Sequence, residues 1–467
     1  MTLRFEPILT DGIAQVSYFI CDDAKFSAAV IDPVPDCDVY LEKAKQYGVV
    51  ITHIFETHIH ADFMSGAREL EHRCKGSAKI YASVEGDASY DFNVEGIKDG
   101  DNFDFGEVKV TVKHTPGHTP EHLSFMLIDP DHEDNKPWGI VTGDSLFVDS
   151  VGRPDLLGDE KTEELTQALF KTMREFFCKL DNDVMIFPCH AAGSACGPNI
   201  GDRMNSTIGY EKKYNEYMQI TDYDAFKKAI QDNAPPVPTH YPKMKKLNAK
   251  GPKAYGHTPH VKALDVTAFE KAGQDKDAII IDTRDMQAFG NGHVEGAINI
   301  GLKPILSVWS GWLIDPDAPI YLVLERDDDC AHIVNLLWRT GHTNIKGYLA
   351  GGMEKWRETG KPLKQLPQLS VHDLHNSLDN YQPLDVRKNS EWQSGYIPGA
   401  KHEFIGTLTK NLDQLDKTEN IVTYCASGYR ASIASSILQK HGFKNISNTM
   451  GSIKAWKASN YKIETPK

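Results

Sequence analysis

Three short stretches in the first third of the chain carry side chains of the types that bind metal ions. They are Thr57-His-Ile-His-Ala-Asp62, Thr115-Pro-Gly-His118 and Thr142-Gly-Asp144. Imidazole nitrogens and carboxylate oxygens are common ligands of metal ions in proteins. A single His-x-His pair is often only a pair of surface histidines, but three such stretches within one domain are not a scattered set. We therefore expect a metal site in this part of the chain.

A fourth stretch, near the C-terminus, carries a cysteine. Residues 421–425 form an apolar run that ends in Cys425, a short loop follows, and an amphipathic helix begins close to Arg430. Backbone N–H groups of such a loop point inward, and the helix N-terminus adds positive potential. Both favour the thiolate over the thiol and stabilise a persulfide anion. The alternative is a buried core cysteine at a strand end, which the following Ser-Gly-x-Arg disfavours.

The metal-binding stretches follow predicted β-strands. Residues 28–32 and 49–55 are apolar enough for buried strands, and residues 108–112 alternate like a half-exposed strand. Side chains at the ends of successive strands converge on one edge of a sheet, where a rigid backbone holds ligands in place. Residues 162–177 predict a one-faced helix, because their apolar residues recur at helical spacing. The pattern indicates a mixed α/β domain.

Bulk composition limits the classes of protein that fit. The 467 residues suggest about three domains, and the formal net charge of -14 argues against a nucleic-acid partner. Eight sparse, unevenly spaced cysteines favour a reducing compartment over a disulfide scaffold. The N-terminus lacks the layout of a signal peptide, and no stretch approaches the roughly 20 apolar residues of a membrane span. We expect a soluble, cytoplasmic protein with no membrane partner.

A domain boundary is predicted within residues 233–253. Four prolines lie within residues 235–242, and because proline fixes φ and removes a hydrogen-bond donor we expect neither helix nor central strand there. The boundary closes a first domain of residues 1–245.

The chain repeats itself after this boundary. Asp282-Thr-Arg284 recurs as Asp385-Val-Arg387, and Gly292-His-Val-Glu-Gly-Ala297 recurs as Gly395-Tyr-Ile-Pro-Gly-Ala400. A repeat length of about 100 residues indicates duplicated domains rather than the short units of a solenoid. Each copy alternates strands with helices, which is typical of a small α/β sheet. The predicted copies are residues 255–362 and residues 366–467.

The metal-binding stretches resemble those of the metallo-β-lactamase superfamily, and the resemblance covers roughly residues 1–230. The usual run of that superfamily is Thr-His-x-His-x-Asp-His, and Phe63 stands here in place of the last His. A ligand of a second metal ion is therefore missing, which disfavours a dinuclear zinc hydrolase of the glyoxalase II type. The resemblance implies an αββα sandwich.

A narrower resemblance links residues 143–155 to the persulfide dioxygenases, in which the metal-binding Asp precedes a Gly-Arg-x-Asp segment. In that family two His and one Asp hold a single ferrous ion, which implies His58, His118 and Asp144 here. Two histidines and a carboxylate on one face leave open positions for substrate and dioxygen. Zinc is redox-inert and would support hydrolysis only.

Three further residues lie where the superfamily places other ligands. They are His60, Asp62 and His190. We interpret them as residues that support the ligands or line the substrate pocket, with direct ligation as the alternative.

The resemblance also implies substrate contacts. Arg153 is expected to bind the anionic part of a thiol persulfide, unless it pairs with Asp155 instead. Cys196 lies in a glycine-rich loop, so that exposure to the pocket as an auxiliary persulfide site is a further expectation. In the implied reaction both atoms of dioxygen are added to the terminal sulfur of R-S-S⁻, and sulfite is released after hydrolysis.

The cysteine loop resembles the active loop of rhodaneses, over roughly residues 368–460. The resemblance implies that Cys425 accepts sulfane sulfur and that Ser427, Gly428 and Arg430 bind the anion.

The equivalent position in the middle copy is Leu324 or Glu325, depending on a one-residue gap, and neither carries sulfur. Three aspartates at positions 327–329 would repel an anion. We therefore interpret the middle copy as an inactive spacer that packs against its neighbours or aids oligomerisation.

The order of domains resembles bacterial fusions of persulfide dioxygenase and sulfurtransferase that detoxify sulfide. The resemblance implies one Fe(II) per chain, a low-molecular-weight thiol persulfide and O₂ as substrates, and sulfite or thiosulfate as products. It also suggests a homodimer or homotetramer. The thiol carrier (glutathione, coenzyme A or another thiol) and the direction of sulfur transfer stay open. The alternatives are a zinc thioester hydrolase with accessory rhodanese domains and a non-enzymatic sulfur sensor.

Overall fold

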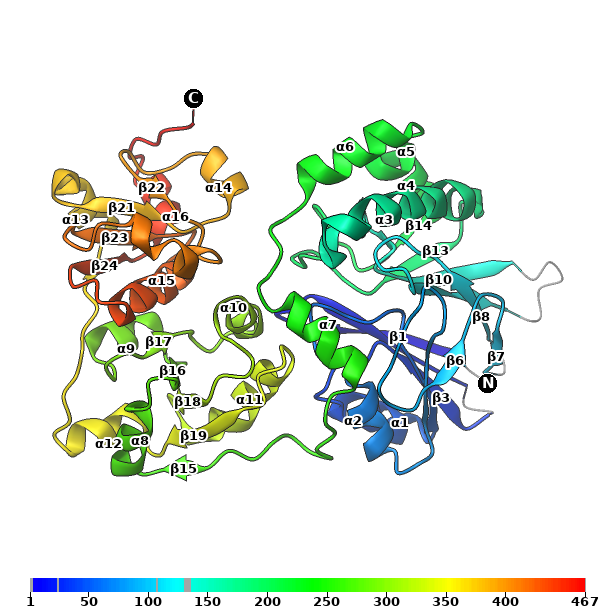
Figure 1. The fold of residues 1–467 in the computed structure, drawn as a ribbon, viewed down its shortest axis with the longest axis horizontal. Coiled ribbons are helices and arrows are strands. Elements are labelled where there is room, and N and C mark those ends of the chain that lie inside the picture. The colour runs from blue at the N-terminus through cyan, green and yellow to red at the C-terminus, as the bar shows by residue number, and fades with distance from the viewer. Residues whose placement is uncertain (1–2, 23–24, 106–107, 130–135, 467) are drawn as a thin grey trace. The chain divides into compact units, whose positions relative to one another are not determined.

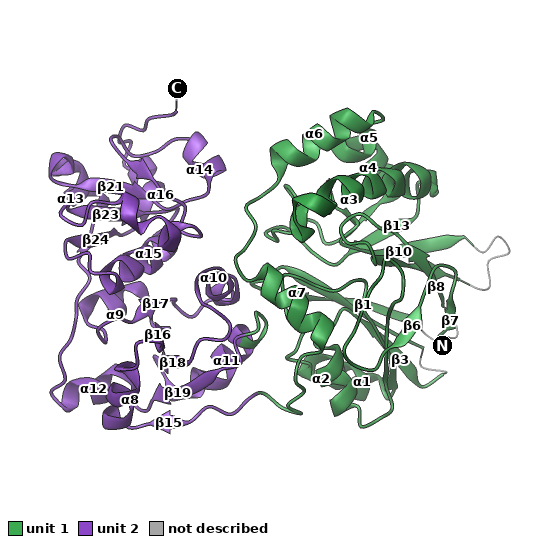
Figure 2. Cartoon of the chain, in the orientation of Figure 1, with its two compact units in different colours: residues 1–258, 338–341 green, residues 259–337, 342–467 purple. Residues whose placement is uncertain are grey.

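The computed structural model describes residues 3–22, 25–105, 108–129 and 136–466 (Figure 1). The chain divides into two compact units (Figure 2). Unit 1 holds residues 1–258 with 338–341, and unit 2 holds residues 259–337 with 342–467. Among the described residues, no helix has both the length and the apolar character needed to cross a membrane.

Unit 1 contains two six-stranded sheets. The first sheet has the order β1-β2-β3-β4-β5-β6, antiparallel from β1 to β3 and parallel from β3 to β6. Its strands are β1 (Leu3–Thr10), β2 (Gln15–Asp22), β3 (Ser27–Ile31), β4 (Val50–Phe55), β5 (Lys79–Ser83) and β6 (Glu95–Ile97).

The second sheet has the order β14-β13-β10-β9-β8-β7, and only its β10–β13 pair is parallel. Its strands are β7 (Asn102–Asp104), β8 (Lys109–His114), β9 (Leu123–Ile128), β10 (Pro137–Gly143), β13 (Met185–Pro188) and β14 (Ser206–Thr207). A short hairpin of β11 (Leu146–Phe147) and β12 (Ser150–Val151) follows β10. The predicted strands at 28–32, 49–55 and 108–112 are confirmed as β3, β4 and β8.

The core of unit 1 lies between the two sheets. Tyr18 and Ile20 of β2 pack in one buried cluster with Val110 of β8 and Phe125 of β9. A second buried cluster joins the outer face of the second sheet to the helices that cover it. This is the αββα arrangement that the sequence predicted. The helices of unit 1 are α1 (Asp38–Tyr47), α2 (Ala67–Arg73), α3 (Asp159–Lys171), α4 (Ile208–Tyr214), α5 (Glu216–Gln219), α6 (Tyr223–Asn233) and α7 (Tyr241–Lys250).

Helix α7 corrects one prediction, because residues 233–253 were expected to hold no helix. Pro235, Pro236 and Pro238 do lie in an irregular segment, but Pro242 falls within the first turn of α7. A proline is tolerated there because the N–H groups of the first turn have no partner within the helix. Helix α7 belongs to unit 1 and lies against its metal-binding loops, with Asn248 bonded to the carbonyls of His60 and Phe63.

Unit 2 contains two five-stranded sheets, both parallel throughout, as predicted. The orders β15-β19-β18-β16-β17 and β20-β24-β23-β21-β22 are the same topology repeated. The strands are β15 (Ala263–Leu264), β16 (Ile279–Asp282), β17 (Ile298–Asn299), β18 (Ile320–Val323), β19 (Ile345–Leu349), β20 (Gln368–Leu369), β21 (Gln382–Asp385), β22 (Lys401–His402), β23 (Ile421–Tyr424) and β24 (Ile446–Thr449).

Helices cover both sheets of unit 2. They are α8 (Val266–Gly273), α9 (Met286–Asn291), α10 (Leu306–Leu313), α11 (Cys330–Trp338), α12 (Gly352–Glu358), α13 (Val371–Asn376), α14 (Asn389–Gln393), α15 (Tyr429–Lys440) and α16 (Ser452–Ala458). One buried cluster runs through both copies and joins Ile298 and Trp309 of the first to Ile433 and Ile437 of the second. The two copies of unit 2 therefore share a core.

Candidate metal centre and cysteine loop

The three residues predicted as ligands come together in unit 1. One ligand atom from each of His58, His118 and Asp144 lies within 4.8 Å of the other two, and all three side chains are buried. His58 follows β4, His118 follows β8 and Asp144 follows β10. The expected convergence of strand ends therefore occurs, although the role of each residue as a ligand stays a proposal.

Buried atoms of this group that have no hydrogen-bond partner fit a metal ion. His58 Nε2 and Asp144 Oδ2 are buried without a hydrogen-bond partner. Asp144 Oδ2 lies 3.9 Å from His58 Nε2 and 3.5 Å from His118 Nε2, which is too far for good hydrogen bonds. Buried polar atoms without partners are costly, and an ion bound between the three side chains would satisfy both of these atoms. The donor set, two nitrogens and one carboxylate oxygen, fits Fe(II).

Hydrogen bonds on the far side of each imidazole fix its orientation. His118 Nδ1 lies 3.0 Å from the carbonyl oxygen of Arg153, and His58 Nδ1 lies 2.9 Å from Thr57 Oγ1. Thr57 itself donates its N–H and its hydroxyl to the carboxylate of Asp32. Both Nε2 atoms are thus directed at Asp144, as metal-bound histidines require.

The other carboxylate oxygen of Asp144, Oδ1, belongs to a chain of charged side chains. His190 Nδ1 lies 2.8 Å from Asp144 Oδ1, and His190 Nε2 lies 2.7 Å from Asp62 Oδ2. Burial alone would lower the pKa of His190, but Asp144 and Asp62 raise it well above its usual value. Burial likewise favours a raised pKa for Asp144, yet the charge and hydrogen bond of His190 hold it below its usual range. Asp144 is therefore a carboxylate, while burial and neighbouring imidazoles lower the pKa of His58 and keep it neutral.

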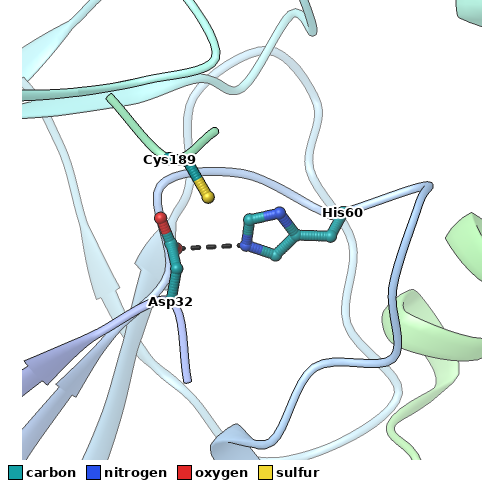
Figure 3. A group of neighbouring side chains, drawn as sticks. All are labelled: Asp32, His60 and Cys189. Carbon is teal, nitrogen blue, oxygen red and sulfur yellow. Dashed lines mark hydrogen bonds and ion pairs between the residues drawn. The ribbon is translucent and has the colours of Figure 1, made fainter. Parts of the chain in front are cut away.

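His60 pairs with carboxylates other than that of Asp144. Its Nε2 lies 3.1 Å from Asp32 Oδ1 and 3.4 Å from Glu56 Oε2, and Figure 3 shows its ring facing Asp32 with the sulfur of Cys189 beside them. The ring of Phe63 packs against His60 with a centroid separation of 4.3 Å and is fully buried. His60, Asp62 and His190 thus pair with other protein groups, and the supporting role predicted for them stays a proposal.

Two residues that were predicted to contact the substrate are buried against other protein groups. Arg153 forms a two-pronged ion pair with Asp155, at 2.7 and 2.6 Å, and its side chain is buried. This is the structural alternative that the sequence left open. Cys196 was expected to be exposed in its loop, but it is only 1% exposed and packs near Tyr241 of α7. The expectation of exposure is wrong because α7, unforeseen in the sequence, covers this loop.

Cys425 lies between β23 and α15 in unit 2 and is buried. The backbone N–H of Gly428 points at its sulfur, with N and Sγ 3.1 Å apart, and the backbone N–H of Cys425 donates to Ser452 Oγ. Gly428 has φ +114, a conformation that side-chain-bearing residues rarely adopt. The inward-facing loop amide predicted from the sequence is therefore present at Gly428.

Arg430 lies at the start of α15 beside this loop. Its two terminal nitrogens each lie 2.7 Å from the carboxylate of Glu391 at the start of α14. Burial alone would raise the pKa of Glu391, but the Arg430 partner lowers it below its usual value. The predicted contact between Arg430 and a bound anion thus competes with an ion pair inside the protein.

The middle copy lacks this arrangement. Asp282 pairs with Val323 in the first sheet of unit 2, and Asp385 pairs with Tyr424 in the second. The next residue, Leu324, therefore occupies the position of Cys425, which decides between Leu324 and Glu325. The loop then continues through a short 3-10 helix, Asp327–Asp329, before α11 begins.

Comparisons with known proteins agree with this architecture. Residues 10–190 match the family model described as the metallo-beta-lactamase superfamily, and residues 265–359 and 370–459 match the rhodanese-like domain. A solved structure titled metallo-beta-lactamase from Staphylococcus aureus is 32% identical, with 74% of this chain and 98% of that chain covered and a TM-score of 0.66. The chain belongs to the metallo-β-lactamase superfamily. Its metallo-β-lactamase domain is followed by tandem rhodanese-like domains.

Curated relatives of the metallo-β-lactamase domain include two kinds of enzyme. Human mitochondrial persulfide dioxygenase ETHE1 is 28% identical over 40% of this chain and 66% of its own length. A mouse hydroxyacylglutathione hydrolase-like protein is 26% identical over 48% of this chain and 81% of its own length. The chain thus spans slightly under two thirds of the human relative.

Two buried residues of the metallo-β-lactamase domain were missed in the sequence. His122 Nε2 accepts the backbone N–H of Asp144, and burial lowers the pKa of His122 to about 3. Asp32 positions Thr57 and His60 from a left-handed backbone with φ +51. Each could have been noticed in the sequence, because His122 follows His118 closely and Asp32 ends a predicted strand. Neither residue stands in a motif with a recognisable ligand spacing.

Proposed function

We propose that this chain oxidises the terminal sulfur of a low-molecular-weight thiol persulfide to sulfite and transfers sulfur through Cys425. The observation that carries the proposal is the pair of unpartnered atoms, His58 Nε2 and Asp144 Oδ2, that face each other beside His118. His58, His118 and Asp144 would hold one Fe(II) per chain. When bound, the ion supplies a redox-active centre with positions left for both reactants.

In the proposed oxidation, R-S-S⁻, O₂ and water give R-SH, sulfite and one proton. The protein contributes geometry and charge rather than acid–base steps. The His190 imidazolium between Asp144 and Asp62 keeps Asp144 ionised and fixed. Phe63 stands where the usual superfamily run has its last histidine, and its ring packs against His60. These two features support a mononuclear site.

In the proposed transfer, a persulfide on Cys425 gives its outer sulfur to sulfite. A sulfur–sulfur bond breaks at Cys425 Sγ and one forms to sulfite, which leaves a Cys425 thiolate and thiosulfate. The Gly428 amide faces the sulfur, and Ser427 and Arg430 complete the proposed anion site. The reverse reaction would use the same groups. Having both sites on one chain raises the local concentration of their shared intermediate.

Oxygen uptake by the anaerobically purified, iron-loaded protein tests the oxidation. We expect uptake when glutathione persulfide is added and a loss of at least about a thousandfold in Asp144→Ala, because a ligand is removed. The matched control is Asp155→Asn, a carboxylate of the same loop that bonds Arg153 instead. No uptake by the iron-loaded wild type with any persulfide would contradict the proposal.

The product ratio tests the coupling. We expect Cys425→Ser to leave oxygen uptake within about twofold and to shift the product from thiosulfate to sulfite, since oxidation does not use this thiol. Sulfite and thiosulfate are measured by chromatography after derivatisation. An unchanged ratio would contradict the coupled mechanism.

A second function is carried by the match to the hydroxyacylglutathione hydrolase-like protein. A zinc thioester hydrolase would need a metal-activated water at the same ligands. The packed Phe63 ring argues against the dinuclear form of that enzyme. Metal analysis together with hydrolysis of S-lactoylglutathione separates the two functions, because only the hydrolase would act without oxygen.

Compartment, domain limits and assembly remain proposals. None of the eight cysteines, all of them among the described residues, forms a disulfide, which favours the reducing cytoplasm. The predicted limits, residues 1–245, 255–362 and 366–467, enclose the stretches that match the family models. A homodimer or homotetramer is proposed from the family resemblance alone.

A further inference from the structure

The loop of Cys425 contacts the middle copy as well as its own domain. The side chain of Met286, the first residue of α9, lies against Gly428. A Cβ added to Gly428 would lie 3.0 Å from Met286 Sδ and 3.2 Å from Met286 Cε, whereas the carbonyl oxygen of Thr449 in the last copy would be 3.8 Å away. The thioether of Met286 therefore packs on the backbone of Gly428.

A second contact with the middle copy falls on the residue that follows Gly428. Tyr429 donates its hydroxyl to the carbonyl oxygen of Gly301 at 2.8 Å, and Lys303 Nζ lies 5.3 Å from the centre of the Tyr429 ring. Gly301 and Lys303 belong to the segment between β17 and α10. Two separate segments of the middle copy thus hold two adjacent residues of the last copy.

These contacts lie where the backbone geometry matters for the thiol. The N–H of Gly428 points at Cys425 Sγ, with N and Sγ 3.1 Å apart, and it does so from a backbone with φ +114. Few residues adopt this conformation without support from their surroundings. Since both copies share one buried core, the support that Met286 and Gly301 give comes from a fixed neighbour.

The position of Met286 carries a different kind of side chain in the last copy. Met286 begins α9 two residues after Arg284, and Asn389 begins α14 two residues after Arg387. Asn389 is exposed, whereas Met286 is half-buried. Methionine is unbranched and flexible, which suits it to packing against an irregular loop. One position of the repeat thus carries, in the middle copy, a side chain that packs on the other copy.

We propose that Met286 and Gly301 of the middle copy position the Gly428 amide toward Cys425 Sγ for sulfur transfer. This inference rests on the proposed transfer, because it adds two positioning groups to that site. Each group acts through the loop and not on the sulfur itself. The middle copy carries no sulfur of its own, yet it is part of the sulfur-transfer site and not only a spacer.

Substitution of Met286 in the full chain tests this role. We expect Met286→Ala to lower kcat/KM for thiosulfate by about threefold to tenfold in the thiosulfate:cyanide assay, because a displaced group beside the reacting atom slows the reaction. Met286→Leu keeps most of the volume and should restore kcat/KM to within about twofold. The matched control is Gln287→Ala, at the next and exposed residue of α9, which should change nothing.

Substitution of Tyr429 tests the second contact. Tyr429→Phe removes the hydrogen bond to Gly301 and should lower kcat/KM by about threefold. Tyr461→Phe, which loses a bond to His372 elsewhere in the last copy, is the matched control and should leave kcat/KM unchanged. Full activity in both Met286→Ala and Tyr429→Phe would overturn the proposal.

A double variant separates positioning from a general loss of stability. If Met286 acts through the Gly428 amide, adding Met286→Ala to Gly428→Ala should lower kcat/KM by less than about twofold further, because both changes disturb the same amide. Losses that multiply would mean that Met286 acts independently of the amide, and they would overturn the proposal.

Hydrogen exchange separates this inference from the proposed transfer. If the wild type moves no sulfur from thiosulfate to cyanide, the transfer proposal fails. Exchange of the backbone N–H groups of residues 426–432, measured by mass spectrometry on the full chain, then tests the positioning alone. Faster exchange in Met286→Ala than in Met286→Leu and Gln287→Ala supports it, and equal exchange in all three variants overturns it.

Discussion

The two rhodanese-like copies of unit 2 share a scaffold and differ in one loop. Arg284 bonds Asp282 and the carbonyl of Gly292, and Arg387 makes the same bonds to Asp385 and Gly395. These bonds are thus present both in the copy with Cys425 and in the copy with Leu324 at that position.

The two copies diverge in the loop that follows β18 in the first sheet and β23 in the second sheet. Leu324 replaces Cys425, and Gly352 stands where Ser452 accepts the N–H of Cys425 in the last copy. In the middle copy the carboxylate of Asp327 instead accepts the N–H of Gly351. An acidic side chain thus bonds a backbone amide in the loop region where an anion would have to bind. The middle copy therefore differs from the last copy in the whole loop and not only in the absence of the thiol.

The largest expected effect is on the thiol itself. Cys425→Ser should lower thiosulfate:cyanide sulfurtransferase activity by at least about a thousandfold, because serine cannot carry sulfane sulfur. Cys330→Ser, the matched change at the cysteine of the middle copy, should leave activity within about twofold. Residual transfer in Cys425→Ser that disappears in the double variant would break the comparison.

The next effect is expected at the loop glycine. Gly428→Ala should lower kcat/KM for thiosulfate by about tenfold to a hundredfold, because φ +114 strains alanine and shifts the amide that faces Cys425 Sγ. An added Cβ would also lie 3.0 Å from Met286 Sδ. The control is Gly296→Ala, with φ +78 and open space around it, which should affect transfer little. Equal losses in both variants would show a general effect on folding.

A smaller effect is expected at the loop arginine. Arg430→Met should raise KM for thiosulfate by about tenfold, because it removes a cation beside the anion site. Arg326→Met removes the exposed arginine of the middle loop and should leave KM unchanged. If Arg430→Met lowers the thermal midpoint but not the affinity for thiosulfate, its bond to Glu391 is structural only.

The smallest effect is expected from restoring a thiol to the middle copy. Leu324→Cys in the Cys425→Ser background should regain less than about 1% of transfer, because the acidic loop Asp327–Asp329 repels the anion. The assay is thiosulfate:cyanide sulfurtransferase activity at saturating thiosulfate. Substantial recovery would mean that the cysteine alone is sufficient.

Features with a local sequence pattern were predictable. The repeat, the strands before the metal-binding loops and the convergence of His58, His118 and Asp144 depend on short motifs at strand ends. Helix α7 was not predictable from the sequence. Four prolines within residues 235–242 indicate an irregular segment, although Pro242 suits the first turn of a helix. The 3.7 Å approach of Lys245 Nζ to Glu121 Oε1 was not predictable either, because it exists only once α7 packs on the loops.

The residue of the middle copy that is equivalent to Cys425 could be identified only from the structure. A one-residue gap left Leu324 and Glu325 equivalent by sequence, and the pairing of Val323 with Asp282 decided between them. Contacts between the copies had no sequence signal at all. Tyr429, next to the Cys425 loop, donates its hydroxyl to the carbonyl of Gly301 in the middle copy.

Asn299 of the middle copy is bonded on every side. Its amide nitrogen donates to the carbonyls of Asp282 and Arg284, its side-chain oxygen accepts from Ser432 of α15, and its backbone N–H donates to Ser436. A substitution of Asn299, which lies two strands away from Leu324 in the sheet, would therefore break bonds within the middle copy and to α15. A shortened version of this protein that begins at residue 366 would expose the serine-lined side of α15 to water. A fragment that begins at Pro259, where unit 2 starts, would keep the middle copy that covers this side of α15.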